Sequence, residues 1–132
     1  MKDISELNFP DNVRYTPDHE WAMPEAGAIR AGISDYAQDQ LGDVVYVELP
    51  RPGDRFEMGE VFGTVESVKA VSELFMPVAG QIFAVNAALT DLPDLVNSDP
   101  YGKGWMIDIT PAEPSLPETL MTREAYLRLL RG

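Results

Sequence analysis

The sequence predicts a mainly β domain with a small internal helix and a second helix at its C-terminal end. Its 10 glycines and 11 prolines are dispersed between short apolar runs, a spacing that favours many short strands over long helices. Several of these runs alternate between apolar and polar positions, which is the period of a strand with one buried face. With 132 residues we expect a single domain over 1–132, with its core in about 13–110 and no need for disulfides or metals.

Before residue 43 the pattern indicates one strand and the small helix. Residues 28–33 form an apolar, strand-like run, and residues 23–27 before them are loop-like. Ser34 is expected to cap a helix over about 35–41, because its hydroxyl can accept a hydrogen bond from an otherwise unpaired backbone N–H. Gly42 is expected to end this helix in the left-handed conformation.

The middle of the chain carries the clearest strand signals. Residues 44–49 alternate, which places Val45 on the same side as Val47. Three further strands are expected in the following segment, over 61–66, 71–75 and 81–85. Only residues 67–70 connect the first two, which is the length of a β-hairpin connection. Lys69 therefore lies at the tip of a predicted hairpin.

The last third of the chain is expected to return from loop to strand to helix. A short helical turn is predicted near Pro93, because proline suits the first helical position. A strand follows over 104–109, and then a proline-punctuated linker over 111–117. The C-terminal helix is expected over 122–130. Its predicted apolar side consists of Ala125, Tyr126, Leu129 and Leu130.

Composition and charge exclude several classes of function. Ten basic residues against 22 acidic ones give a net charge of −12, which argues against binding to nucleic acids and to anionic membranes. The absence of cysteine excludes disulfides, thiolate metal sites and thiol catalysis. The chain has neither a membrane-spanning apolar run nor a secretory or arginine-rich leader, so a cytoplasmic protein is expected.

No group of residues predicts an active site or a metal site. His19 is the only histidine, and a His19–Glu20 pair supplies too few ligands for zinc. No nucleophile elbow, phosphate-binding loop or dinucleotide fingerprint occurs. We therefore expect no catalytic residue and no bound metal, and the ordinary role of a lone histidine is a structural hydrogen bond.

Lys69 stands out among the lysines. Of the three, Lys2 is terminal and Lys103 lies in a glycine-bounded loop, whereas Lys69 lies inside the patterned centre of the chain. An exposed lysine amine is a weak nucleophile, but another enzyme can build an amide on it. A rigid hairpin with one long flexible arm is the geometry of a swinging carrier. The alternative at this point is an ordinary solvated lysine in a turn.

Four segments resemble motifs of the glycine cleavage system H-protein family. Glu66–Ser72 resembles the family's lipoyl-attachment motif around the modified lysine. The other three resemble its remaining motifs in the same order: Tyr15–Trp21, Gly32–Pro50 and Asn97–Trp105. The resemblance covers about residues 13–109.

This resemblance implies a fold, a cofactor and a set of partners. The fold would be the barrel-sandwich hybrid of lipoyl and biotinyl carriers. Lys69 would hold lipoate as an amide within the motif formed by Glu66, Ser67, Val68 and Ala70, and the protein would have no catalysis of its own. The arm would take an aminomethyl group from a pyridoxal-phosphate-dependent glycine decarboxylase to a tetrahydrofolate-dependent aminomethyltransferase. Dihydrolipoamide dehydrogenase would reoxidise it, a lipoylating or octanoylating enzyme would attach it, and a monomer would suffice.

The cargo has chemical needs that suggest further site residues. An aminomethyl amine on the arm is positively charged and hydrolyses in water, so it should lie in a cleft with acceptors. The candidates are Glu20 and Glu73, with His19 positioning the arm and Trp21 walling the cleft. Packing roles remain open for His19 and Trp21, and recognition by the lipoylating enzyme remains open for Glu66 and Glu73.

Three other functions are compatible with a lysine at this position. The first is a relay that passes an octanoyl or lipoyl group from Lys69 to 2-oxoacid dehydrogenases. The second is a biotin carrier, which places methionines on both sides of its lysine, whereas the neighbours here are Val68 and Ala70. The third is an interaction module whose lysine stays unmodified.

Overall fold

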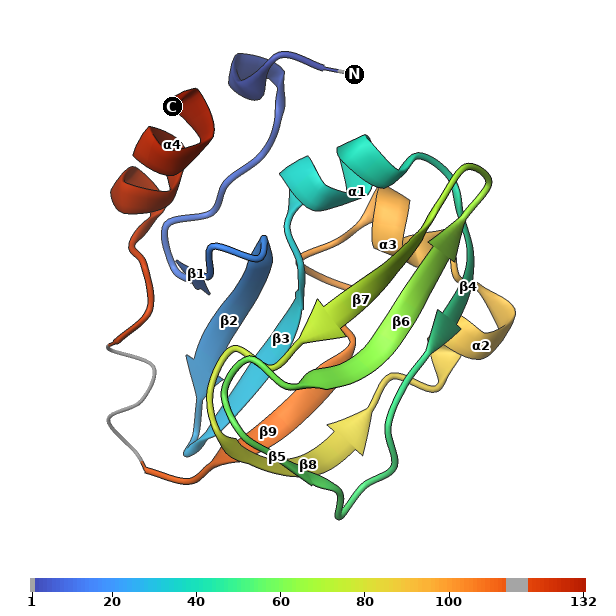
Figure 1. The fold of residues 1–132 in the computed structure, drawn as a ribbon, viewed down its shortest axis with the longest axis vertical. Coiled ribbons are helices and arrows are strands. Elements are labelled where there is room, and N and C mark those ends of the chain that lie inside the picture. The colour runs from blue at the N-terminus through green and yellow to red at the C-terminus, as the bar shows by residue number, and fades with distance from the viewer. Residues whose placement is uncertain (1, 114–118) are drawn as a thin grey trace.

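The computed structural model describes residues 2–113 and 119–132, whose strands form two antiparallel sheets (Figure 1). The larger sheet has the order β1-β2-β3-β9-β8-β5, and the smaller has the order β4-β6-β7. The elements are a 3-10 helix Ile4–Glu6, β1 Arg14–Tyr15, β2 Glu20–Glu25, β3 Ala28–Ile33, α1 Asp35–Leu41, β4 Val44–Glu48, β5 Arg55–Phe56, β6 Val61–Ser67, β7 Val71–Phe75, β8 Gly80–Val85, α2 Ala88–Asp91, α3 Leu95–Ser98, β9 Ile107–Pro111 and α4 Arg123–Arg131. The predicted mainly β fold is confirmed.

The main core lies between the two sheets. Apolar side chains of the larger sheet, such as Ile29 and Ile109, meet side chains of the smaller sheet, such as Val65 and Leu74, in one buried cluster. Each of these four is at most 1 % exposed. Burial of such side chains is the main stabilising contribution to a fold of short strands. It fixes the smaller sheet, and with it the β6–β7 hairpin, on the body of the domain.

A second, aromatic cluster joins the two ends of the chain. Tyr126 from α4 stacks on Tyr15 from β1, with ring centroids 4.6 Å apart and planes at 1°. Phe9 lies edge-on to both rings, and Leu127 completes the apolar face of the helix. Thr122 caps α4 by accepting a hydrogen bond from the Ala125 N–H. As a result, α4 lies beside the N-terminal segment in Figure 1.

The local signals around α1 are confirmed with one refinement. Ser34 caps the helix by accepting from the Ala37 N–H, and the helix spans the predicted residues 35–41. Gly42 follows with φ +80° and ψ −161°, so its positive φ is confirmed but it is not in the left-handed helical region. This combination of angles is essentially restricted to glycine.

The alternation predicted for residues 44–49 is wrong in part. The ladder between β4 and β6 shifts register between Val44 and Tyr46, so that Val44 and Val47 are buried while Val45 is 48 % exposed. A bulge of this kind changes which residues of a strand face the core, because each inserted residue moves the following side chains to the other face.

Other boundaries also move. Residues 23–25, read as loop, end β2, and the short strand β5 was not predicted. Two short helices, α2 and α3, flank Pro93, which precedes the first residue of α3 by two positions and does not start the helix.

The C-terminal end differs from its prediction in three respects. The last strand begins at Ile107, three residues later than predicted, and it includes Pro111. Leu127 is buried on α4, whereas Leu129 is 46 % exposed. Most of the linker predicted over 111–117 lies outside the described residues.

Candidate functional site

Lys69 occupies the tip of the hairpin between β6 and β7, as predicted. The turn closes through the Ser67 N–H, which donates to the Ala70 carbonyl at 2.8 Å, and through the Ser67 hydroxyl oxygen, which accepts from the Ala70 N–H. The Val68 N–H donates to the Asp43 carbonyl at 3.0 Å, so the tip leans on the turn that follows α1 (Figure 1). The exposed Lys69 side chain is thus carried by a turn held from two sides.

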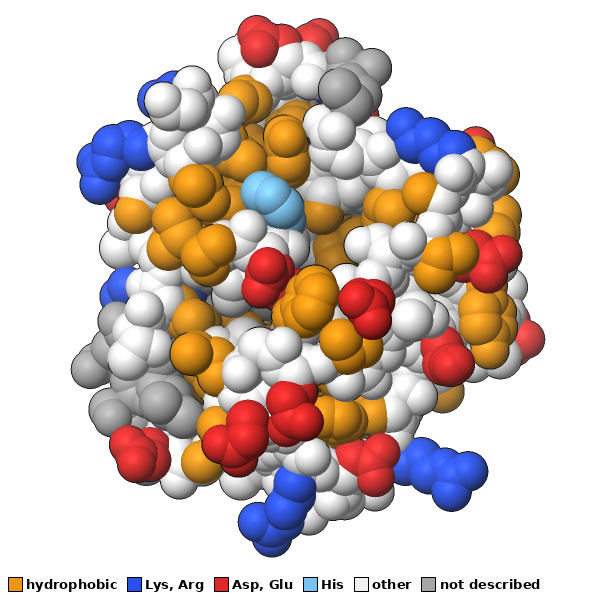
Figure 2. Space-filling view, viewed as in Figure 1, with side chains coloured by type: hydrophobic (Ala, Val, Ile, Leu, Met, Phe, Trp, Pro, Cys, Tyr) orange, Lys and Arg blue, Asp and Glu red, His pale blue; other side chains and the backbone are white. Residues whose placement is uncertain are grey.

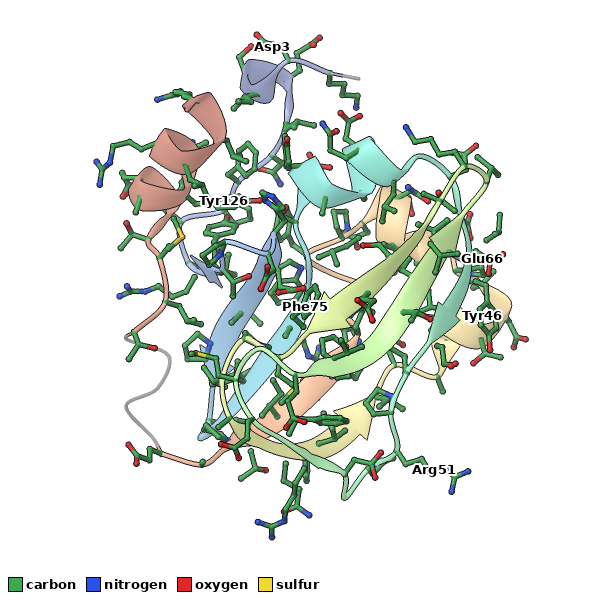
Figure 3. All side chains as sticks on the ribbon, in the orientation of Figure 1. Asp3, Tyr46, Arg51, Glu66, Phe75 and Tyr126 are labelled. Atoms are coloured by element: carbon green, nitrogen blue, oxygen red, sulfur yellow. The ribbon has the colours of Figure 1, made fainter. Side chains whose placement is uncertain are left out.

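The residues next to Lys69 face different environments. Val68 is 69 % exposed, Ser67 is buried under the turn, and Ala70 lies at the surface. Glu66 is exposed on the outer face of the smaller sheet, where its strand pairs it with Tyr46 on one side and Val71 on the other. Figure 3 shows Tyr46 and Glu66 together on that face. A partner that approaches Lys69 along β6 therefore meets apolar and acidic side chains side by side.

A cleft of about 310 Å³ begins beside this hairpin. The turn between β1 and β2, helix α1 and strand β7 form its walls, and Figure 2 shows the chain's single histidine on this face. The lining residues are Asp18, His19, Glu20, Ile33, Tyr36, Ala37, Gln40, Leu41, Val65, Ala70, Val71, Ser72, Glu73 and Leu74. Because Ala70 belongs both to this lining and to the turn that carries Lys69, an arm on that lysine has direct access to the cleft.

Glu20 supplies a buried carboxyl group to this cleft. It is 2 % exposed, and its two oxygens accept hydrogen bonds from the Thr16 hydroxyl at 2.9 Å and the Phe75 N–H at 3.1 Å. No lysine or arginine forms an ion pair with it within the described residues. Burial raises the pKa of Glu20 to about 8, against the opposing effect of the two hydrogen bonds. At neutral pH an empty cleft therefore holds this group mainly protonated.

His19 is held in an uncommon backbone conformation at the mouth of the same cleft. Its φ is +70°, and its N–H donates to the Thr16 carbonyl at 3.0 Å to close the turn. Its Nδ1 lies 2.8 Å from the Tyr126 hydroxyl, and its ring lies 5.0 Å from that of Tyr36. Burial lowers the pKa of His19, which favours the neutral imidazole.

Of the other two residues expected in the cleft, Glu73 lines it and Trp21 does not. Glu73 is exposed and lines the cleft, as expected. Trp21 does not line it: the indole is fully buried, lies over Gly32, and donates its Nε1–H to the Pro100 carbonyl at 2.9 Å. Adjacent residues of a strand point to opposite faces, so Glu20 and Trp21 cannot both face the cleft. The expectation that Trp21 walls the cleft is therefore corrected to a packing role.

The sequence analysis did not identify two cleft residues on α1, nor a residue of α4 that contacts His19. Tyr36 and Gln40 lie four residues apart on α1, a spacing that places them on one helix face, so helix periodicity was a usable signal. Tyr126 contacts His19 from the other end of the chain, and no local pattern signals a contact of that kind.

The described residues contain neither a cluster suited to a metal ion nor a helix long and apolar enough to cross a membrane. The residues that are present fit a covalently attached arm, because the exposed Lys69 is the neighbour of Ala70, which lines a cleft with apolar walls and carboxyl groups. Two packed sheets with one lysine on a hairpin tip are the architecture of lipoyl and biotinyl carrier domains.

Comparison with known proteins defines the family. Residues 13–132 match the family model described as glycine cleavage H-protein. The glycine cleavage system H protein of Bacteroides thetaiotaomicron is 50 % identical over 96 % of this chain and 100 % of its own length. That of Anaeromyxobacter sp. (strain K) is 54 % identical over 91 % of this chain and 94 % of its own length. A crystal structure of the Mycobacterium marinum H protein has a TM-score of 0.85 and 39 % identity, and it covers 94 % of this chain and 100 % of its own. The chain belongs to the glycine cleavage H-protein family.

Membership confirms the class of function predicted above. Proteins of this family are lipoyl carriers without catalytic activity of their own, and they hold lipoate covalently on a lysine. Their partners are glycine decarboxylase, aminomethyltransferase and dihydrolipoamide dehydrogenase. The barrel-sandwich fold, the cofactor, the non-enzymatic role and these partners are accordingly confirmed.

Proposed function

We propose that Lys69 is the lysine that carries lipoate and that the adjoining cleft shelters the aminomethyl cargo. The single observation that carries this proposal is the position of Lys69, exposed on a hairpin tip held by hydrogen bonds and next to Ala70, which lines the cleft. When bound, lipoate supplies the disulfide and thiol chemistry that the cysteine-free chain does not have.

The cleft residues hold the cargo and keep water from it. The aminomethyl group is an ammonium ion when protonated. Of the acidic residues that line the cleft, Asp18, Glu20 and Glu73, we assign the pairing with this ion to Glu20 and Glu73. The apolar side chains of Leu41, Val65 and Leu74 limit access of water. Glu20 gives up its proton on pairing with the ammonium, because a nearby positive charge favours its ionised form.

We assign the outer face of the smaller sheet to recognition by other proteins. Glu66 and Val68 are exposed beside Lys69, where the enzyme that attaches a lipoyl or octanoyl group must bind. The net charge of −12 would speed the approach of basic partner surfaces in general. We further propose that the protein acts as a monomer in the cytoplasm, since the H proteins that it resembles come from bacteria.

The test is the substitution Lys69→Arg, with Lys103→Arg as its control. Lys103 is also exposed in a turn, but it lies far along the chain in the segment before β9. The intact mass of the wild-type protein from its native host, with peptide mapping, should show one lipoyl amide on Lys69. Lys69→Arg should fold normally, carry no lipoate and support no glycine–CO₂ exchange, whereas Lys103→Arg should behave as wild type.

Two results would contradict the proposal. Glycine–CO₂ exchange supported by Lys69→Arg would show that the carrier lysine lies elsewhere. An octanoyl group on Lys69 in a protein that supports no exchange would instead identify a relay for lipoate synthesis.

A further inference from the structure

Helix α4 places the phenol group of Tyr126 against the imidazole of His19. Tyr126 is fully buried, and its hydroxyl lies 2.8 Å from His19 Nδ1 and 2.9 Å from the Ser34 hydroxyl. Figure 3 shows Tyr126 reaching from α4 toward the body of the domain. The contact spans 107 residues of sequence, so the position of α4 bears directly on the state of His19.

The directions of these hydrogen bonds follow from the protons available. The Ala37 N–H donates to Ser34 Oγ, and Ser34 is fully buried. Within the described residues, Tyr126 Oη is the one acceptor recorded for the Ser34 hydroxyl. Buried hydroxyl protons almost always have an acceptor, so Ser34 donates to Tyr126.

Tyr126 must then direct its own proton to His19. Burial raises the pKa of Tyr126 far above its ordinary value, so its hydroxyl keeps its proton. Tyr126 Oη already accepts from Ser34, and His19 Nδ1 is the other group within reach. In a neutral imidazole one nitrogen accepts and the other carries the proton. With Nδ1 accepting, the proton of His19 stands on Nε2.

We propose that Tyr126 is a positioning residue that fixes His19 as the Nε2–H tautomer, so that the cleft is offered a hydrogen-bond donor and not a base. The inference deepens the proposed function of the cleft and rests on it for the identity of the ligand. The strongest acceptor on a lipoyl-lysine arm is its amide carbonyl oxygen, and that oxygen is the group an Nε2–H would hold. An imidazole that already carries its proton on Nε2 does not remove one from the ammonium of the cargo.

The surroundings of the ring support a single orientation. The turn holds His19 at φ +70°, which sets the direction of its Cα–Cβ bond. Tyr36 packs against the ring at 5.0 Å, and Tyr126 holds Nδ1. The neighbouring titratable groups, Asp18 and Glu20, are left unchanged by the substitutions below.

The experiment uses the fact that His19 is the only histidine of the chain. Long-range ¹H–¹⁵N spectra of the ¹⁵N-labelled protein report both imidazole nitrogens without overlap. In the wild type we expect Nδ1 to have the shift of an unprotonated nitrogen and Nε2 that of a protonated one. In Tyr126→Phe, both nitrogens should move toward the averaged shifts of a ring that exchanges tautomers.

Tyr15→Phe is the matched control. Tyr15 stacks on Tyr126 in the same buried cluster, but its hydroxyl donates to the Pro10 carbonyl at 2.6 Å and does not touch His19. This variant should leave the His19 shifts as in the wild type. The lifetime of the aminomethyl cargo on lipoylated protein is the second measurement. It should fall roughly two- to tenfold in Tyr126→Phe, the range expected for one lost hydrogen bond, and remain within about twofold in Tyr15→Phe.

The outcomes test separately the tautomer of His19, the role of Tyr126 and the role of His19 in the cleft. A wild-type spectrum with the proton on Nδ1 overturns the inference, and this measurement needs no variant to fold. Unchanged His19 shifts in a folded Tyr126→Phe variant overturn the positioning role of Tyr126. Altered shifts with an unchanged cargo lifetime uphold Tyr126 as the residue that sets the tautomer, but remove His19 from the proposed function of the cleft.

Discussion

Replacing Glu20 by glutamine should make the protein less stable than wild type in acid and more stable in alkali. The carboxyl group is 2 % exposed and accepts hydrogen bonds from the Thr16 hydroxyl and the Phe75 N–H. Glutamine has nearly the same shape, but its NH2 group brings one more buried proton than the neutral carboxyl group has, and that N–H has no acceptor in place. The substitution therefore exchanges a titratable group for a neutral one and leaves one buried donor unpaired.

The magnitude follows from proton linkage. Burial raises the pKa of Glu20 from 4.5 to about 8, so between these pH values the folded state holds a proton that the unfolded state has released. Stability conferred by this proton is fully present below about pH 4.5 and is lost as the pH rises through 8. The difference corresponds to on the order of 5 kcal/mol above pH 8. Against this, the unpaired donor in the glutamine variant costs about 1–3 kcal/mol at every pH.

The assay is chemical denaturation of both proteins from pH 4 to pH 9. Glu20→Gln should be less stable at pH 4 by about 1–3 kcal/mol, and the two stability curves should cross near about pH 6. The exposed Glu57→Gln is the control, and its difference from wild type should stay within about 0.5 kcal/mol throughout. A difference between Glu20→Gln and wild type that does not vary with pH would refute the proton linkage and the protonated state of the empty cleft.

Two further substitutions test the support of the hairpin. Gly63→Ala should destabilise the protein by about 2 kcal/mol or more, because the new Cβ atom would collide with the Glu48 carbonyl in the adjacent strand. Urea denaturation measures this loss, and an unchanged stability would contradict the close approach of β4 and β6. Asn97→Ala should cost about 2–4 kcal/mol, because the Asn97 amide bonds both the Gly42 carbonyl and the Val44 N–H. Asn97→Ala should also speed amide exchange in the hairpin tip, because the Val68 N–H donates to the Asp43 carbonyl of the turn that Asn97 holds. Unchanged exchange at Val68 would show that Asn97 does not support the hairpin tip.

Local signals were sufficient wherever a few consecutive residues determine the structure. The Ser34 cap, the 35–41 helix and the positive φ of the glycine that ends it were predicted correctly because capping involves neighbours in sequence. The Lys69 turn was predicted because only residues 67–70 separate the two strands expected over 61–66 and 71–75. The exposed lysine of the candidate site could therefore be found without knowledge of the fold.

Contacts between distant segments could not be predicted in this way. The bulge in β4 depends on its pairing with β6, and the exposure of Val45 follows from that register alone. The contact between Tyr126 and His19 depends on where α4 docks, which helix periodicity does not specify. Trp21 is a different case, because strand alternation alone already excluded it from the face that Glu20 occupies.

Of the three carboxyl groups that line the cleft, Glu20 and Glu73 differ in burial and would therefore bind an ammonium ion differently. A cargo bound too tightly would not be delivered, and a cargo left in water would be lost. The exposed Glu73 attracts an ammonium ion only weakly, because water screens it. The buried Glu20 would attract it strongly, but much of that attraction is offset by the loss of its own proton and by the desolvation of both charges. A neutral, buried carboxyl group thus gives a site that excludes water without holding its cation irreversibly, and raising its affinity by a second fixed carboxylate should slow delivery to the next enzyme.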